Sequence, residues 1–267
     1  MSIIPSPSAV EMAGYSKAVY SNAAYNPAKA ELADKDAPGF PIPMKVGQKS
    51  PIKYVFYVIK ENRTYDQVLS DIKTGNGDTT LLLFGRKYTP NQHAISEKFV
   101  LLDNFYVDSE VSADGHHWSM GAYATDFMEK NWPTSYGGKG GGIYGEPEKN
   151  AVMNKSGYIW DLCNRYGVTY RTYGEFMTGN KPAISVLDKH FHPTFPSYSL
   201  AIMDTTRLRI WKTEFQEMVN ENRVPQFNSI RLGNDHTEGL RLGRPTPYAH
   251  VADNDLAVGQ LIETLAN

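Results

Sequence analysis

The sequence predicts an α/β fold whose central sheet is mostly parallel and covered by helices on both faces. From about residue 51 onward, apolar segments of strand length alternate with segments of helical periodicity, a pattern typical of parallel sheets with crossover helices. Polar clusters directly follow three of the expected strands, and open α/β sheets bind their ligands at that edge. With 267 residues, the chain is long enough for one large domain of this kind.

Residues 1–50 are rich in Ala, Pro and Ser, a composition typical of a linker or leader with at most one short helix around Ser8–Tyr20. The domain of residues 51–267 is expected to begin with a strand at 54–60, where β-branched and aromatic residues dominate. The elements expected next are helices at 65–71 and 92–99, a strand at 100–106, and a helix at 117–130.

The Gly-rich segment 137–145 lacks the Gly-Lys-Ser/Thr ending of a phosphate-binding P-loop, so we expect a flexible surface loop there. A helix at 157–166 follows and carries the single cysteine, Cys163, which we expect at a small core position. The remaining expected elements are a strand at 169–173, a long amphipathic helix at 205–222, a strand at 226–232 and a last helix at 252–265.

Charge and hydropathy patterns exclude several classes of partner. The formal net charge of −2 and the pI near 6.4 give no basic surface for nucleic acid or an anionic membrane. The N-terminal residues lack the basic and apolar regions of a signal peptide, and no apolar stretch reaches the roughly 18 residues that a membrane-spanning helix needs. We therefore expect no nucleic-acid partner, no signal peptide and no integral membrane segment in this chain.

The first polar cluster follows the strand at 54–60. Glu61 and Asn62 offer hard oxygen donors that suit a divalent cation, and Arg63 offers a planar donor fork that suits phosphate. The alternative interpretation is a strand followed by an ordinary charged turn.

The second cluster precedes a helix and contains the candidate nucleophile Ser112. A hydroxyl just before a helix N-terminus lies among free N–H groups, which stabilise an alkoxide and bound phosphoryl oxygens. His116, four residues later, suits a phosphate contact or an acid role, whereas His117 is compatible with a polar residue at the helix start. Rival hydroxyls are present on Ser109, Ser119 and Thr169, for which caps, surface positions or strand propensity are sufficient explanations.

The third cluster follows the strand at 226–232. Asp235 and His236 are adjacent, and a turn could bring them together at one site, although an Asx-rich turn with a solvated His explains them equally well. His190 and His192 lie in Pro-rich surroundings and are expected in a surface loop.

The segment Val58-Ile-Lys-Glu-Asn-Arg-Thr-Tyr-Asp66 resembles the ENRSFD-type signature of the phosphoesterase family that includes phospholipases C and acid phosphatases, within the alkaline-phosphatase superfamily. In relatives of this kind a nucleophilic Ser or Thr is followed by Pro-Asn and often by a His four residues on. Ser112-Ala-Asp-Gly-His116 keeps the hydroxyl and the His but replaces Pro-Asn by Asp-Gly. The resemblance covers about residues 51–267 and implies an alkaline-phosphatase-like fold.

By this resemblance the chain is expected to be a metal-dependent phosphoric ester hydrolase that acts through a phosphoserine intermediate. Glu61, Asn62 and Ser112 would be ligands of a divalent metal ion, zinc or another. His116 and His236 would hold the ester with Ser112 as the nucleophile, and Arg63 and Asp235 would bind substrate. Similar domains often follow β-propellers in exported or surface proteins, whereas no signal peptide is expected in this chain. The localisation is therefore left open.

Relatives continue past the last helix into a strand with an acidic pair and a final Asp-His, which complete the metal site, and nothing in this chain matches them. We therefore expect a C-terminally incomplete domain. The alternative function is a truncated or degenerate domain that serves as a surface binding module without catalysis. An incomplete sheet predicts exposed apolar surface, pairing with a second copy or marginal solubility. The side chains expected to be exposed are Val258, Leu261, Ile262 and Leu265.

Overall fold

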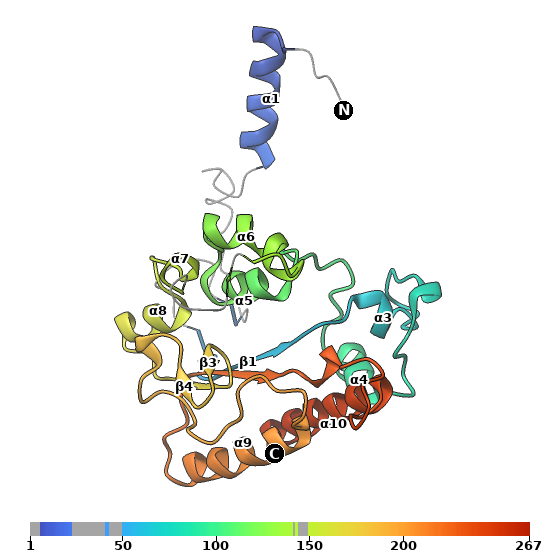
Figure 1. Ribbon diagram of the computed structural model, residues 1–267, viewed down its shortest axis with the longest axis vertical. Helices are drawn as coiled ribbons and strands as arrows, with labels where there is room; N and C mark the ends of the chain where they lie inside the picture. Colours follow the sequence, from blue (N-terminus) through green and yellow to red (C-terminus); the bar gives the residue numbers. More distant parts are fainter. Residues whose placement is uncertain (1–5, 23–40, 43–49, 141, 144–148) are drawn as a thin grey trace. The chain divides into compact units, whose positions relative to one another are not determined.

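The computed structural model describes residues 6–22, 41–42, 50–140, 142–143 and 149–267 (Figure 1). The chain divides into two compact units, residues 1–53 and 54–267. The described part of the first unit contains α1 (Ala9–Asn22), a helix with no buried residue. None of the helices within the described ranges is both long enough and apolar enough to cross a membrane.

The second unit is built on a small parallel sheet. Its strands are β1 (Val55–Lys60), β2 (Tyr170–Tyr173) and β5 (Phe227–Leu232), in the spatial order β1-β5-β2. Both outer strands run parallel to β5, so the carboxyl ends of all three strands lie at one edge of the sheet. The predicted α/β class and parallel pairing are therefore confirmed. A separate antiparallel hairpin joins β3 (Met177–Thr178) and β4 (Lys181–Pro182).

Helices connect and cover these strands. Local signals start and end several of them: Thr64 caps α3 through a capping box, Thr246 caps α10 ahead of a proline at its first position, and Gly167 ends α8 in the left-handed region. The α-helices are α3 (Tyr65–Leu69), α4 (Pro90–Lys98), α5 (Ser112–Gly121), α6 (Asp126–Tyr136), α7 (Lys149–Val152), α8 (Ile159–Tyr166), α9 (Asp204–Asn220) and α10 (Pro247–Ala266). The 3₁₀ turns are η1 (Thr79–Leu81), η2 (Ser185–Leu187) and η3 (Asn234–His236).

The strand predicted at 100–106 is wrong. This segment forms no strand and has no pairing partner in the described part of the chain, and its large apolar side chains Val100, Leu102 and Phe105 are exposed. Strand propensity reflects how well a side chain packs on a pleated, half-buried surface. Without a neighbouring strand, the apolar composition of the segment is not sufficient to form one.

The single helix predicted at 117–130 is also wrong, because two helices occupy this region. Helix α5 ends at Gly121, and Ala122 after it adopts a left-handed backbone conformation with φ of 60°. Thr125 then caps α6 by accepting a hydrogen bond from the Met128 N–H. The chain therefore turns between the two helices, and α6 begins with its own cap.

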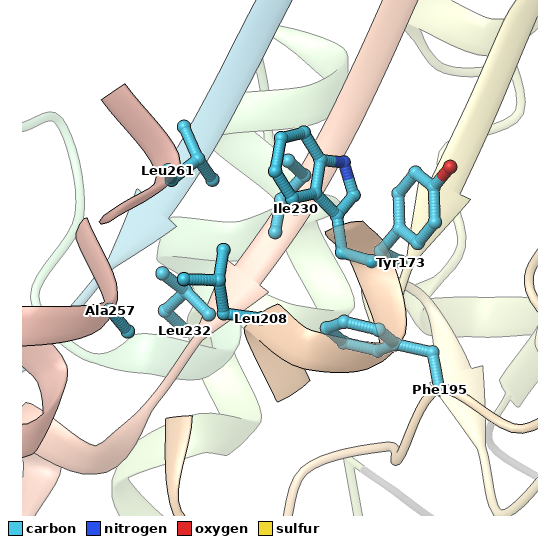
Figure 2. Packing of buried hydrophobic residues seen from close by; sticks show 8 residues of the cluster. Tyr173, Phe195, Leu208, Ile230, Leu232, Ala257 and Leu261 are labelled. Atoms are coloured by element: carbon cyan, nitrogen blue, oxygen red, sulfur yellow. The ribbon is translucent and has the colours of Figure 1, made fainter. Parts of the chain in front are cut away.

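Two hydrophobic clusters cover opposite faces of the sheet. Side chains alternate between the two faces of a strand, so Ile230 and Leu232 of β5 pack on one face while Phe227 packs on the other. The first cluster lies between the sheet and helices α9 and α10 (Figure 2), and its buried members are Tyr173, Phe195, Leu208, Trp211, Ile230, Leu232, Ala257 and Leu261. The second lies against α5 and α8, and its buried members are Met120, Tyr158, Trp160, Cys163, Tyr170, Leu187 and Phe227. Helices on both faces and a core position for Cys163 are thus confirmed.

The expected exposure of the apolar face of α10 is wrong. Leu261 is 1% exposed and belongs to the first cluster, and Val258, Ile262 and Leu265 are partly buried against it. Helix α10 packs along α9 and the turn η3, and this packing buries its apolar side. Exposed apolar side chains of the sheet belong instead to the outer strand β1, on Val55 and Tyr57.

Helix α10 supplies a matched pair of leucines that tests this core. Leu261→Ala removes a fully buried side chain, and we expect it to lower the free energy of unfolding by about 2–5 kcal/mol. Leu256→Ala on the same helix, where the side chain is 47% exposed, should change it by less than about 1 kcal/mol. Chemical denaturation of both variants measures the difference, and equal losses would contradict the burial of Leu261.

Candidate functional site

A pocket of about 650 Å³ lies where the carboxyl ends of the strands meet the start of α5. It receives Glu61 after β1, Glu175 after β2, Arg231 near the end of β5, and Ser112 at the start of α5. Ligand sites of open parallel sheets form at this edge. Other lining residues are Ala113, His116, His117, Met128, Tyr136, Ile143, Val152, Met153, Phe176, Met177, Thr178, Lys181, Pro182, Ala183, Tyr198 and His236.

The carboxylate of Glu61 joins three parts of the pocket. It accepts a hydrogen bond from the Ser112 hydroxyl, lies 3.2 Å from His116 Nε2 and accepts a 2.9 Å hydrogen bond from Arg231 Nη2. Burial alone would raise the pKa of Glu61, but the hydrogen bond and charge of His116, the hydrogen bond from Ser112 and the charge of Arg231 hold this pKa well below its usual range. Glu61 is therefore ionised at neutral pH.

Ser112 is the first residue of α5, where backbone N–H groups lack partners within the helix. The buried carboxylate of Asp114 accepts hydrogen bonds from the N–H groups of Glu110 and Val111 and so fixes the approach to the helix. The positive end of the helix dipole favours negative charge next to Ser112. The position suits a nucleophile that takes up a phosphoryl group.

Glu175, which the sequence interpretation missed, holds His116 from the other side. Its Oε1 lies 2.7 Å from His116 Nδ1, so the imidazole is placed between two carboxylates. Burial lowers the pKa of His116, but the charge and hydrogen bond of Glu175 and the hydrogen bond to Glu61 raise it to about 9. His116 is therefore a cation at neutral pH. Glu175 lies between Gly174 (φ 85°) and Phe176 (φ 52°) in a tight turn directly after β2. Its position just after an expected strand is the sequence feature that could have identified it as a site residue.

The turn η3 carries the third predicted cluster and separates its members. His236 lines the pocket, and its ring packs against the Tyr198 ring in a T-shaped arrangement with 5.8 Å between ring centroids. Asp235 is 2% exposed, pairs with Lys60 and does not line the pocket. Arg63 also lies outside the pocket lining, because its guanidinium donates to the backbone carbonyls of Asp235 (2.8 Å) and His236 (2.7 Å). Arg63 and Asp235 thus shape the turn in this structure.

The pocket brings together Glu61, Ser112, His116 and His236 but not Asn62, which is exposed and outside the lining. The rival hydroxyls of Ser109, Ser119 and Thr169 also lie outside the lining. The sequence allowed His117 to be a merely polar residue at a helix start, yet it is 6% exposed and lines the pocket. Part of the Gly-rich segment 137–145 lies outside the described residues.

A divalent metal ion would require roughly four to six ligands. In the parts of the chain that the structure describes, no group of three or more His, Cys, Asp or Glu side chains is arranged to hold one. Glu61 and Ser112 supply oxygens, but the Glu61 carboxylate is already bonded to the cationic groups of His116 and Arg231. These residues by themselves do not fit such an ion.

Comparisons with protein-family models, with curated proteins and with solved structures find no match to this chain. Its function is therefore inferred from the pocket and from the sequence resemblance.

The buried pair of Asp235 and Lys60 predicts a specific pH dependence of stability. Burial raises the pKa of Asp235 from 3.8 to about 6 against the opposing charge of Lys60, and its Oδ1 has no hydrogen-bond partner among the described residues. An acid whose pKa is raised by folding stabilises the fold fully below its unfolded pKa, and this contribution is lost as the pH rises through the folded pKa. Between about pH 4 and pH 7 the loss is on the order of 3 kcal/mol.

Asp235→Asn should remove this component, so its free energy of unfolding should fall less, or rise more, between about pH 4 and pH 7 than that of the parent protein. Urea denaturation at several pH values measures the difference. Asp126→Asn, at a carboxylate that is 79% exposed, is the control and should follow the parent. Parallel curves for Asp235→Asn and the parent would contradict the raised pKa.

Proposed function

We propose that residues 54–267 form a phosphoesterase domain that hydrolyses phosphate esters through a phosphoserine on Ser112. The observation that carries the proposal is the contact between the Ser112 hydroxyl and the Glu61 carboxylate at the start of α5, inside a pocket that also contains the cationic side chains of His116 and Arg231. The resemblance of residues 58–66 to a phosphoesterase signature supports the same reaction class.

Binding of the phosphoryl group uses groups already present in the pocket. The N–H groups at the start of α5 and the guanidinium of Arg231 are suited to phosphoryl oxygens, and the His116 cation adds positive charge. Such preorganised charges are most effective where negative charge develops in the transition state. His236 lies on the same lining and would contact the ester.

In the first step the Ser112 Oγ attacks phosphorus, and its proton passes to the Glu61 carboxylate and then to solvent. The bond from phosphorus to the alcohol oxygen breaks, and the alcohol leaves with that electron pair and takes up a proton. In the second step water attacks phosphorus, the bond to Ser112 Oγ breaks, and phosphate leaves as the hydroxyl regains a proton. Glu61 is a weak base because its pKa is low, so its main role is to orient the hydroxyl. Phosphoryl transfer passes through a loose transition state, for which the positioning of the nucleophile contributes more to catalysis than a strong base does.

A second candidate function is binding of a phosphate ester without catalysis. The observation that favours it is the pairing of Glu61 with both His116 and Arg231, which leaves the carboxylate little basicity to remove the Ser112 proton. Turnover distinguishes the two functions, since binding alone produces no alcohol.

Hydrolysis of 4-nitrophenyl phosphate by Ser112→Ala and Ser119→Ala tests the proposal. Loss of the nucleophile should reduce kcat by roughly 10³-fold or more, whereas Ser119, exposed on the same helix, should be dispensable. Parallel assays with added Zn²⁺ and with a chelator test whether the expected divalent cation takes part.

Mass spectrometry of acid-quenched enzyme should find phosphate on Ser112. Ester binding without turnover would support the second candidate function instead. Equal activity of the parent and Ser112→Ala would contradict the role of Ser112.

A further inference from the structure

The pocket has an apolar wall that the phosphoryl chemistry does not use. Met128 of α6 and Val152 of α7 are 1% and 3% exposed and belong to one hydrophobic cluster, against which Met153 packs. Phe176, after β2, also lines the pocket and packs against the second cluster. A bare phosphate needs only a small part of a volume of about 650 Å³. The wall therefore has room for the organic group of an ester.

The polar side chain of His117 lies next to this apolar surface. Its Nδ1 lies 2.8 Å from the Tyr158 hydroxyl, which itself accepts a 3.0 Å hydrogen bond from the Asn154 N–H. The ring also packs edge-on to Phe176, with 5.3 Å between ring centroids. His117 is thus held in one orientation by an aromatic contact and a hydrogen bond.

These contacts determine which ring nitrogen of His117 carries the proton. Burial and the charge of His116 lower the pKa of His117 to about 4, and burial raises the pKa of Tyr158 to about 12, so both groups are neutral near pH 7. The single proton of the Tyr158 hydroxyl has two acceptors within reach, His117 Nδ1 at 2.8 Å and the weakly accepting sulfur of Met153 at 3.4 Å. We assign it to Nδ1, the stronger and nearer acceptor, which places the imidazole proton on Nε2. Among the described residues Nε2 has no hydrogen-bond partner, and it is not a fully buried atom. It is a free donor on a residue that lines the pocket.

We propose that the pocket selects phosphate esters whose organic group is uncharged and largely apolar and carries one hydrogen-bond acceptor, which His117 Nε2 binds. This inference rests on the proposed function and adds the substrate class. A charged organic group would lose its hydration against Met128, Val152, Met153 and Phe176 without gaining a partner there. Lys181 also lines the pocket but is exposed. Solvent therefore screens its charge, and the organic group of the ester needs no negative charge to pair with it.

Binding of phosphonates tests the inference without requiring turnover. Methylphosphonate probes the phosphoryl end alone, (4-isopropylphenyl)methylphosphonate adds an apolar group, and (4-acetylphenyl)methylphosphonate adds an acceptor of nearly the same shape. Calorimetry should give the isopropyl compound a Kd roughly tenfold below that of methylphosphonate. The acetyl compound should bind tighter than the isopropyl compound, by roughly three- to tenfold.

Variants separate the two components of this recognition. His117→Phe should remove the preference for acetyl over isopropyl, and His117→Gln, which retains an N–H donor, should keep most of it. Met153→Gln should weaken both aryl ligands but not methylphosphonate, and Leu162→Gln, at an exposed position of α8, should change none of the three affinities.

Equal affinities for the three phosphonates would overturn the substrate class while leaving the proposed function intact. An acetyl preference that persists in His117→Phe would overturn the role of His117. Failure of methylphosphonate and inorganic phosphate to bind, together with absent turnover, would overturn the proposed function and the substrate class with it.

Discussion

The pocket depends on the contacts of the half-buried carboxylate of Glu61. This carboxylate joins Ser112, His116 and Arg231, which lie far from it along the chain. Removing one partner from a fully buried ion pair typically costs about 3–5 kcal/mol because it leaves a charge uncompensated, and the partial exposure of these side chains reduces that cost. The end of β1, the start of α5 and the end of β5 are therefore held together by electrostatics as well as by packing.

The parallel register explains why these groups meet. Ile59 lies opposite Arg231 and Lys60 opposite Leu232. Glu61 follows directly after the end of β1 and meets Arg231, the partner of Ile59, through a hydrogen bond. The buried carboxylate of Asp204 holds the turn η3 that follows β5. Its Oδ2 accepts hydrogen bonds from the Asn234 N–H (2.7 Å) and the Asn254 side chain (2.9 Å). This network fixes the turn that carries His236, and the His236 side chain itself takes no part in it.

Sequence patterns were sufficient to predict the parts of the fold that local physics determines. The strands β1, β2 and β5 and the helices α8 and α9 have periodic apolar residues, and their predicted bounds agree with the structure to within about two residues. Helix α10 was also predicted, but it begins five residues earlier than expected, at Pro247. The segment 100–106 has the composition of a strand but no pairing partner in the described ranges. Whether a segment has a neighbouring strand cannot be predicted from the residues of that segment alone. The break between α5 and α6 depends on the left-handed conformation of Ala122. Glycine usually occupies this conformation, so an alanine in the sequence gives no sign of it.

The candidate site shows a similar division. The sequence predicted that Glu61, Asn62, Ser112 and His236 would gather at one ligand, and all but Asn62 share the pocket lining. The strand expected before Ser112 is absent, so this residue reaches the pocket through the start of α5. Arg63 and Asp235 were assigned to substrate, yet their contacts are with the backbone of η3 and with Lys60. Glu175 and Arg231 escaped attention because their importance arises from tertiary contacts with His116 and Glu61. Residue type and spacing reveal candidate groups, whereas partners depend on how the elements pack.

The most direct test of the account is covalent labelling of the protein with a fluorophosphonate, followed by peptide mass spectrometry. The account predicts a phosphonyl adduct on Ser112, because Glu61 orients this hydroxyl in a pocket with positive charge. Glu61→Gln should slow the labelling of Ser112 by at least roughly tenfold, while circular dichroism confirms that the variant is folded. Labelling of other serines in preference to Ser112, or an unchanged rate in Glu61→Gln, would contradict the central role of the contact between Glu61 and Ser112.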